Sequence, residues 1–315
     1  MPRSLVLGVN GQDGSYLAED LLRRGHEVVG IGRGEKSRYL AEEDGFSYLC
    51  HDLRDVEGLA PLIARLTPDY AFHFAAVHGP AGFQYEPVWR EMLSVNVATL
   101  HVLLEQARRH NPAMRVIYAG SSKVLPAPLH GVIDEDTEKK ATCLYSIGKM
   151  AARDLILQYR ASHAIAATNL IFFNHESSRR PPGFLVQLIA SALASALDDP
   201  TARTDIRTLD FHIDWSAADE LMALSADIAE QSDEAEFVMA SGKTVLARDA
   251  VCDLFRSHGL DYTRHLNETL SGIEPGPKFR VSLDRLEKAI GKRPEKDFVG
   301  IVNSMLNPAL QTERG

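Results

Sequence analysis

Three glycines near the N-terminus constrain the fold of this chain more than any other feature. Gly8, Gly11 and Gly14 follow the apolar run 5–7 directly and precede an amphipathic segment. This order is typical of a strand, a tight turn and a helix. Glycine lets such a turn approach a pyrophosphate closely, and the free N–H groups of the following helix bind the anion. The spacing therefore predicts a dinucleotide-binding turn, with a turn that binds no ligand as the alternative.

The composition narrows the class of partner. A net charge of −9 over 315 residues argues against nucleic acid or an anionic membrane as a partner. Cys50, Cys143 and Cys252 are widely separated and show neither a disulfide framework nor a zinc pattern. His and acidic residues do not recur at ligand spacing, so we expect no metal. We also expect no signal peptide or membrane span, and a cytoplasmic location.

Strands and helices are predicted to alternate through the first half of the chain. Strands are expected at residues 4–7, 27–31, 47–49, 70–74, 115–118 and 166–171, and helices at 15–24, 56–66, 87–110 and 145–161. Such alternation predicts a Rossmann-type, doubly wound parallel sheet in an α/β fold. Ligands of these sheets bind beyond the carboxyl ends of the strands.

The pattern becomes less regular after residue 171. We expect helices at 184–197, 216–231 and 248–258, a loop at 198–205, a helical region beginning at 281–289 and a frayed end at 311–315. Residues 1–172 are therefore predicted to form the cofactor-binding domain. Residues 173–315 are predicted to form mainly a smaller substrate-binding part, with some segments returning to the sheet.

A tyrosine and a lysine carry the clearest chemical signal. Tyr145 and Lys149 are four residues apart and therefore share one face of the predicted helix. A nearby ammonium favours the phenolate and lowers the pKa of tyrosine, which suits proton transfer in a hydroxyl–ketone interconversion. Ser121 follows the fifth predicted strand, where its hydroxyl can hold a substrate oxygen beside Tyr145. A surface Tyr/Lys pair without a catalytic role is the alternative.

The end of the second predicted strand indicates which dinucleotide is bound. Arg33, Lys36 and Arg38 follow this strand, and no carboxylate precedes Glu35. A carboxylate there would hold the ribose of NAD, whereas an arginine suits the 2′-phosphate of NADP. We therefore expect NADP(H), with Arg33 on the phosphate. Solvated loop charges are the alternative.

Blocks spread over nearly the whole chain point to one family. They are residues 11–19, 51–53, 74–76, 86–87, 96, 145–149, 173–180, 214–219, 241–245 and 279–280. Together they resemble the extended short-chain dehydrogenases/reductases, and within these the GDP-mannose 4,6-dehydratases. The resemblance implies a nucleotide-sugar substrate. It also implies a homodimer, or a tetramer, built through the helices at 87–110 and 145–161.

The resemblance also implies roles for individual residues. Tyr145 would remove the hydroxyl proton while the nicotinamide takes a hydride from C4 of the sugar, and Lys149 would also reach the ribose. The cofactor-binding residues would be Gly8, Gly11, Gln12, Asp13, Gly14, Arg33, Asp52, Leu53, Ala75, Ala76, His175 and Arg180. The substrate-binding residues would be His78, Asn174, Glu176 and Arg280.

The sequence departs from this family at a position central to dehydration. The dehydratases carry a catalytic Glu two residues after the Ser/Thr, and here that place is held by Lys123 after Ser121. Ile213 stands where they carry an Arg near the diphosphate, and Leu125-Pro126 replaces Tyr-Gly. The segment 121–126 that follows the fifth predicted strand also resembles GDP-fucose synthase, which has Cys at the third position of this segment, where Lys123 stands here. We therefore expect C4 oxidation or 4-keto reduction.

Two alternatives stay open. One is a true 4,6-dehydratase in which Lys123 or a displaced residue does the proton work. The other is a cofactor-binding sensor without catalysis. The intact Ser121, Tyr145 and Lys149 argue against the sensor, because a binding protein does not need the proton-transfer residues.

Overall fold

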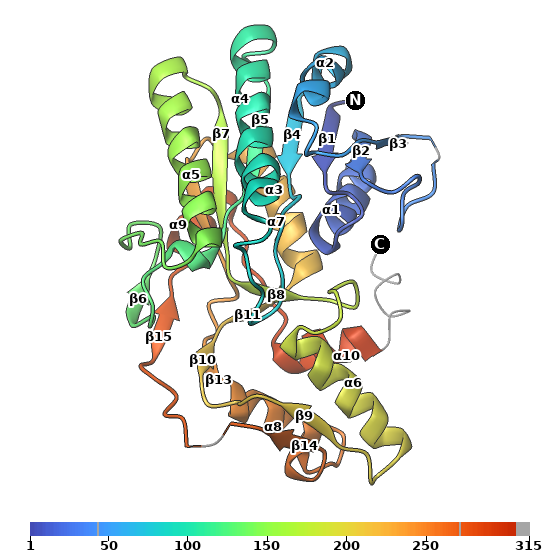
Figure 1. Ribbon diagram of the computed structural model, residues 1–315, viewed down its shortest axis with the longest axis vertical. Coiled ribbons are helices and arrows are strands. Elements are labelled where there is room, and N and C mark those ends of the chain that lie inside the picture. The colour runs from blue at the N-terminus through green and yellow to red at the C-terminus, as the bar shows by residue number, and fades with distance from the viewer. Residues whose placement is uncertain (43, 271, 307–315) are drawn as a thin grey trace.

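One parallel sheet organises the molecule. The computed structural model describes residues 1–42, 44–270 and 272–306 (Figure 1). Within these residues, seven strands form a sheet of order β12-β7-β5-β4-β1-β2-β3. They are β1 (Arg3–Leu7), β2 (Glu27–Gly32), β3 (Phe46–Cys50), β4 (Tyr70–His73), β5 (Arg115–Ala119), β7 (Ala167–Phe172) and β12 (Glu236–Met239). The strand order runs outward from β1 in both directions, which confirms the doubly wound α/β fold.

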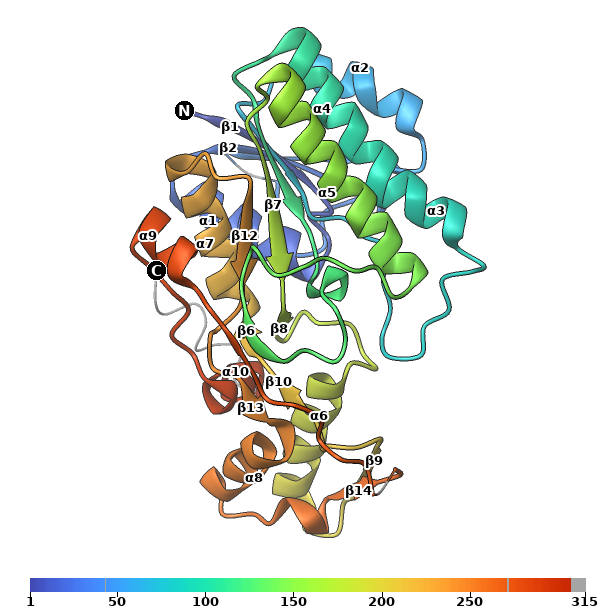
Figure 2. The same cartoon turned by 90° about the vertical axis from the view of Figure 1, so that its left-hand side faces the viewer.

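Helices cover both faces of this sheet (Figures 1 and 2). One face carries α1 (Gln12–Arg23), α7 (Ala218–Gln231) and α9 (Asp284–Ile290), and the other carries α2 (Val56–Leu66), α4 (Thr99–His110) and α5 (Leu144–His163). Successive strand residues point to opposite faces. In β1, Val6 therefore packs toward α1, whereas Leu5 and Leu7 pack toward the α2 side.

The helix expected at 87–110 is interrupted. It consists of α3 (Trp89–Leu93), the π-helical segment η1 (Ser94–Ala98) and α4. The buried Asn96 lies in η1, where its Oδ1 accepts a hydrogen bond from Val77 N at 3.0 Å and its carbonyl accepts one from Tyr118 Oη at 2.7 Å. π-helical insertions of this kind are frequent at functional sites. This one fixes the chain just before His78.

The second half of the chain builds a smaller part below the sheet (Figure 2). Its elements are β8 (Asn174–Glu176), α6 (Leu185–Asp198), β9 (Thr204–Ile206), β10 (His212–Ile213), β11 (Trp215–Ala217), β13 (Val245–Leu246), α8 (Ala247–Ser257), β14 (Leu266–Glu268) and α10 (Phe298–Leu306). Helices α6, α8 and α10 share an apolar core with β11. None of the described helices is long and apolar enough to cross a bilayer.

Two predictions of local structure need correction. The loop expected at 198–205 ends in strand β9, which pairs with β14 in parallel. The helical region expected from 281 begins instead with β15 (Phe279–Val281), paired with β6 (Gly131–Ile133), and α9 follows. Both strands are only three residues long, and their partners lie far away in the sequence. The predicted frayed end at 311–315 lies outside the described residues.

The two parts are interleaved along the chain. Strand β12, from the half assigned mainly to substrate binding, forms the edge of the sheet beside β7. Helix α7 returns with it and packs against α1. Before the chain returns in α7 and β12, β8 and β11 pair in parallel directly below the sheet. The chain therefore passes from the sheet to the smaller part at the carboxyl ends of the strands β7 and β12.

Candidate active site

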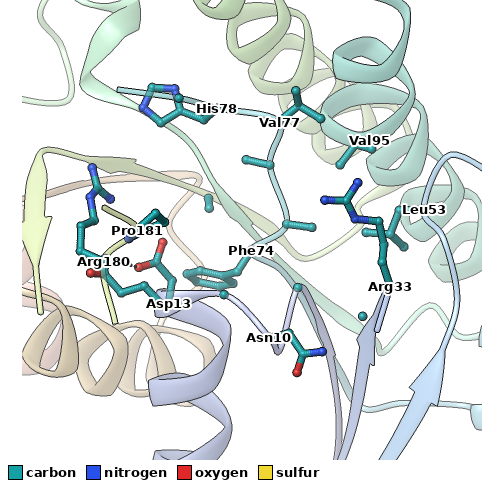
Figure 3. A pocket seen from close by; sticks show the side chains of 18 of the residues that line it. Asn10, Asp13, Arg33, Leu53, Phe74, Val77, His78, Val95, Arg180 and Pro181 are labelled. Atoms are coloured by element: carbon teal, nitrogen blue, oxygen red, sulfur yellow. Dashed lines mark hydrogen bonds between the residues drawn. The ribbon is translucent and has the colours of Figure 1, made fainter. Parts of the chain in front are cut away.

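A cavity of about 1210 Å³ opens at the carboxyl ends of the central strands (Figure 3). The segments that follow β1, β2, β4, β5 and β7 all contribute to its lining. It is therefore the crevice at which an open parallel sheet binds its ligand. It contains most of the residues that the sequence predicts for the site.

The glycine turn lies at the base of this cavity. Gly8 has a φ of +90°, and a Cβ there would lie 2.7 Å from Ala75 N, so no other residue fits. Gly11, Ala75 and Ala76 line the cavity beside it. The bare backbone leaves room for a dinucleotide to approach, and this fits the predicted cofactor.

Gly14 has a different role from the one expected. It is buried and is not among the lining residues. A Cβ at Gly14 would lie 2.4 Å from the carbonyl oxygen of Gly8. Gly14 therefore allows α1 to pack closely on the turn, and its predicted contact with the cofactor is not among the lining contacts of the cavity.

Arg33 lies at the opposite end of the cavity from His78 and Arg180 (Figure 3). It follows β2, its side chain is 69% exposed, and its NH1 lies 3.5 Å from Glu91 Oε1. Lys36 and Arg38 also line this end. A phosphate at this point would meet several cationic groups.

Asn10 fixes this cationic loop, a role that was not predicted from the sequence. Its Nδ2 donates to Lys36 O at 3.2 Å and to Tyr48 Oη at 3.1 Å, and its Oδ1 accepts from Arg38 N at 2.8 Å. Asn10 belongs to the glycine turn, so the turn and the loop after β2 are held together. Only the position of Asn10 between two glycines gave a signal of this role.

Asp52 and Leu53 line the same end of the cavity. Hydrogen bonds from Arg54, one of them 2.5 Å long, lower the pKa of Asp52 to about 2. The side chain of Leu53 is buried beside it. Asp52 is therefore ionised and oriented, as a contact to a base or ribose requires.

Lys149 and Tyr145 come from the first turns of α5 and are both buried. Lys149 Nζ donates to Ala119 O at 2.6 Å and to Tyr118 Oη at 3.1 Å, and it lies 5.6 Å from the centre of the Tyr145 ring. Burial lowers the pKa of Lys149 to about 7, although Asp13 acts in the opposite direction. Lys149 is thus poised between its charged and neutral forms near neutral pH.

The pKa of Tyr145 differs from the expectation. Burial raises it above its ordinary value, and a hydrogen bond with Ser121 opposes this increase only in part. The predicted lowering of this pKa by Lys149 is not found, because burial of the phenol dominates. Tyr145 is therefore a protonated phenol, suited first to donating a proton to a substrate oxygen.

Two aromatic side chains pack against the ring of Tyr145. The ring of His78 lies 4.6 Å from that of Tyr145, and the ring of Tyr85 lies 5.5 Å away. His78 Nδ1 and Tyr85 Oη are hydrogen-bonded at 2.6 Å. His78 lines the cavity as expected, whereas the role of Tyr85 was missed. Tyr85 carries no distinguishing motif, and only the folded loop brings it to Tyr145.

A buried network connects β8 to the start of α1. His175 Nε2 lies 3.0 Å from Asp13 Oδ1, and Gln12 accepts a hydrogen bond from Ser177 Oγ at 2.8 Å. Burial alone raises the pKa of Asp13, but His175 outweighs it and lowers the value to about 2. Asp13 in turn raises the pKa of His175 against the effect of burial. The pair is therefore ionic and holds the second half of the chain on the glycine turn.

Arg179 strengthens the same junction and was not singled out from the sequence. Its guanidinium stacks 4.0 Å over the ring of Tyr16, donates to Ser15 Oγ at 2.9 Å and pairs with Glu19 at 2.5 Å. All three partners lie on α1. A planar cation of this kind can stack and form hydrogen bonds at the same time.

The predicted substrate residues divide into two groups. Asn174 is exposed and lines the cavity together with Arg180, which stacks 3.9 Å over Phe184. Glu176 is buried away from the lining, 3.5 Å from Arg180 Nε, and burial raises its pKa. Arg280 is exposed on β15 and does not line the cavity. Glu176 therefore lies behind Arg180, and Arg280 lies outside the lining of this cavity.

Lys123 lines the cavity from the short helix η2 (Ser122–Val124), directly after β5. Its backbone N–H donates to Ser121 Oγ at 3.2 Å. The side chain is exposed, and no contact of the described residues pairs it with an acid. Nowhere in the described part of the chain do three or more His, Cys, Asp or Glu side chains gather as metal ligands.

The parallel sheet, the glycine turn and the Tyr145–Lys149 pair define an enzyme of the extended short-chain dehydrogenase/reductase class. Within that class, the family model described as GDP-mannose 4,6 dehydratase matches residues 5–284. The chain belongs to that family.

Individual relatives agree with this assignment. The chain is 28% identical over 267 residues to GDP-mannose 4,6-dehydratase from Yersinia enterocolitica, covering 80% of this chain and 70% of that protein. It is 29% identical over 305 residues to GDP-mannose 4,6 dehydratase 2 from Caenorhabditis elegans, covering 88% and 78%. These identities are low enough for specificity to differ within the family.

Solved structures share the fold. A dTDP-glucose 4,6-dehydratase from Bacillus anthracis has a TM-score of 0.80 at 14% identity, covering 99% of this chain and 98% of that one. A UDP-glucose 4-epimerase from Thermotoga maritima has a TM-score of 0.80 at 16% identity, covering 98% and 99%. The complete architecture is therefore common to this chain and to dehydratases and epimerases alike.

Proposed function

We propose that this enzyme modifies a nucleotide-activated hexose with NADP(H), by oxidising C4 or by reducing a 4-keto sugar. A GDP-linked sugar is the first candidate because of the family match. The observation that carries the proposal is the meeting of Ser121, Tyr145 and Lys149 in one cavity, with Lys123 in place of an acid. This group of residues can transfer a proton to or from an alcohol oxygen but lacks a free carboxylate beside it.

The residues of the chain divide the chemical work. Ser121 and Tyr145 hold the sugar oxygen, and Tyr145 gives or takes its proton. Lys149 keeps the carbonyl of Ala119 and the hydroxyl of Tyr118 in place and can shift between its charge states near pH 7. His78 and Tyr85 cover the Tyr145 ring and exclude water from it. The nicotinamide, when bound, would give a hydride to C4 of the sugar or take one from it.

The choice of NADP(H) rests on the loop after β2. Arg33, Lys36 and Arg38 line this end of the cavity, and Asn10 fixes the loop by three hydrogen bonds. Glu35 and Glu91 are also present there, and Arg33 lies 3.5 Å from Glu91. A 2′-phosphate would compete with Glu91 for the guanidinium group and would bind it more strongly through two oxygens.

The decisive experiment follows both cofactor and product. Purified protein is incubated with NADP⁺ and GDP-mannose, and separately with NADPH and a 4-keto sugar, and products are identified by mass. We expect cofactor consumption in proportion to the keto sugar and little product that has lost water. A silent cofactor-binding protein would bind NADPH and turn over neither substrate.

A 4,6-dehydratase activity is the second candidate, and the match of the family model over residues 5–284 favours it. Loss of water needs a proton donor or acceptor at C5 and C6, and Lys123 occupies that place here. Efficient water loss from GDP-mannose by the unmodified protein would establish this candidate and refute the reductase proposal.

A further inference from the structure

The substrate end of the cavity is electropositive. Lys123, Lys149 and Arg180 all line this end around His78. Figure 3 shows His78 and Arg180 on the same side of the cavity. Desolvation in the cleft lowers the pKa of His78 to about 3, and Arg180, Lys149 and Lys123 lower it further in the same direction. His78 is therefore neutral and lies in a positive field.

Carboxylates among the described lining residues do not cancel this charge. They are Asp13, Glu35, Asp52 and Glu91. Asp13 is paired with His175 at 3.0 Å, Asp52 with Arg54 at 2.5 Å and Glu91 with Arg33 at 3.5 Å. Glu35 lies in the loop after β2, at the opposite end of the cavity. The exposed ammonium of Lys123 therefore faces the substrate end without a protein counter-ion.

The backbone fixes where Lys123 can act. Ser121, two residues earlier, forms a hydrogen bond with Tyr145, and its Oγ also accepts the backbone N–H of Lys123 at 3.2 Å. In the function proposed above, Ser121 and Tyr145 would bind the oxygen on C4. The Lys123 side chain starts two residues further along the same turn and lines the same cavity, so it would reach the sugar substituents beside C4.

We propose that Lys123 binds the carboxylate of a nucleotide-linked hexuronic acid, whose C6 is a carboxyl group instead of a hydroxymethyl group. This inference rests on the function proposed above and names its substrate class. A uronate has no hydroxyl on C6 to be lost as water, so the acid that assists water loss has no task. The same carboxylate needs a cation, and a charge-assisted hydrogen bond from an ammonium provides it. A uronate substrate thus explains both why the family's Glu is absent at position 123 and why a lysine stands in its place.

The chemistry of such a substrate is constrained. Transfer of a hydride from C4 to NADP⁺, with the O4 proton passing through the Tyr145 hydroxyl toward the neutral form of Lys149, gives a 4-keto uronate, which is a β-keto acid. Its C5–C6 bond can break to release CO₂, with the electron pair moving into the C4 carbonyl and a proton added at C5. Return of the hydride to the opposite face of C4 before that step, with a proton to O4, gives the 4-epimer instead. Because Lys123 stabilises the charged carboxylate and not neutral CO₂, we expect the epimer to predominate.

Matched substrate pairs test this inference directly. Binding of GDP-mannose and GDP-mannuronate, and of UDP-glucose and UDP-glucuronate, is measured by calorimetry with NADP⁺ present. We expect the uronate of at least one pair to bind more tightly than its neutral partner. In Lys123→Gln this preference is expected to fall about 10-fold or more. Lys140→Gln, an exposed lysine outside the cavity, is the matched control and keeps the preference.

Product masses provide the second readout. A uronate turned over by the unmodified protein is expected to keep its mass or to lose one CO₂, and never to lose one water. Equal or better binding of the neutral sugars, or an unchanged preference in Lys123→Gln, would overturn the assignment of Lys123 and leave the proposed function standing. If NADPH binds but no nucleotide sugar of either kind binds or reacts, the proposed function fails, and this inference fails with it.

Discussion

Lys149 and Tyr145 respond in opposite ways to the loss of water around them. Burial disfavours the charged form of each, so the pKa of Lys149 falls to about 7 whereas that of Tyr145 rises. The free-energy cost of burying the charged form of Lys149 therefore depends on pH. Tyr145, in contrast, keeps its hydroxyl proton. Both effects lead to measurable consequences at these single residues.

Stability is expected to depend on pH through Lys149. Its folded pKa of about 7 lies below the ordinary 10.5, so the unfolded chain binds more protons between these values and stability rises with pH across that window. Lys149→Met removes this cost, which is largest below pH 7. The stability gained by the Lys149→Met variant over the unmodified protein, measured as the difference in free energy of unfolding, is therefore expected to be about 2–3 kcal/mol larger at pH 6.5 than at pH 9. Urea unfolding at both pH values measures this, and exposed Lys140→Met is expected to show no such difference.

Removal of the Tyr145 hydroxyl tests proton transfer. Tyr145→Phe keeps the stacked ring beside His78 and Tyr85, so we expect the fold and cofactor affinity to persist. Turnover is expected to fall about 100-fold or more, since general acid–base catalysis is lost. Steady-state rates and NADPH titrations measure the two effects. Near-normal turnover would remove Tyr145 from the mechanism.

Arg33→Ala tests the choice of dinucleotide. We expect weaker binding of NADP(H) by about 1.5–3 kcal/mol, with little change for NAD(H), because only NADP(H) offers a 2′-phosphate. Fluorescence titration with both dinucleotides measures the difference. Arg65→Ala, an exposed arginine on α2, is the control and is expected to leave both affinities unchanged. Tighter binding of NAD(H) by the unmodified protein would contradict the prediction.

The sequence predicted those site residues that carry a local signal. Gly8 and Gly11 stand in a spaced motif, and Tyr145 and Lys149 share a helix face, so their positions could be inferred before any folding was known. Asn10, Tyr85 and Arg179 could not be found in this way. Their roles depend on partners from other elements, such as Lys36 for Asn10 and Tyr16 for Arg179. The expected pKa of Tyr145 was wrong for the same reason, because burial is a property of the folded chain.

Helix α1 depends on one close contact with the turn before it. A Cβ at Gly14 would lie 2.4 Å from the carbonyl oxygen of Gly8, whereas one at Gly148 in α5 would meet Met92 Cε at an ordinary 3.4 Å. Gly14→Ala is therefore expected to destabilise the protein by about 1–3 kcal/mol and to weaken dinucleotide binding. Gly148→Ala is expected to be neutral or stabilising by up to about 1 kcal/mol. Thermal unfolding with and without NADPH compares them, and equal effects would contradict the proposed packing.

Elements with strong hydrophobic periodicity were predicted best. The strands β1 to β5 and β7 of the central sheet and the helices α1, α2 and α5 are close to their expected bounds, because each buries a continuous apolar face. The edge strand β12 was not predicted as a strand. Strands β9 and β15 were not predicted. Each has three residues, too few to show a period, and each forms only because a distant strand pairs with it. The π-helical segment η1 was not predicted either. It lies within a continuous helix-forming stretch of the sequence, and its residue types do not distinguish a π-helical turn from an α-helical one.

The outer face formed by α4 and α5 bears on assembly of the whole molecule. The two helices lie side by side (Figure 2), and α5 exposes Ile147, Ala151, Asp154 and Gln158 along one face. We expect a homodimer through this face, as the family resemblance implies. Light scattering is expected to give a dimer for the unmodified protein and more monomer for Ala151→Arg, which places a charge at the centre of the face. A monomer at micromolar concentration would contradict the expectation.

The position of β12 has a consequence for the order in which the molecule is made. Strands β1 to β7 leave the ribosome first, but the edge beside β7 and the covering of α1 by α7 need residues up to 239. Until then the nascent sheet presents an unpaired edge and an apolar face, which are the features that chaperones and neighbouring chains recognise. Most of the substrate-binding part is synthesised within or after this interval. A chain stalled or truncated near residue 172 is therefore an aggregation-prone intermediate, and completion of β12 removes the unpaired edge beside β7.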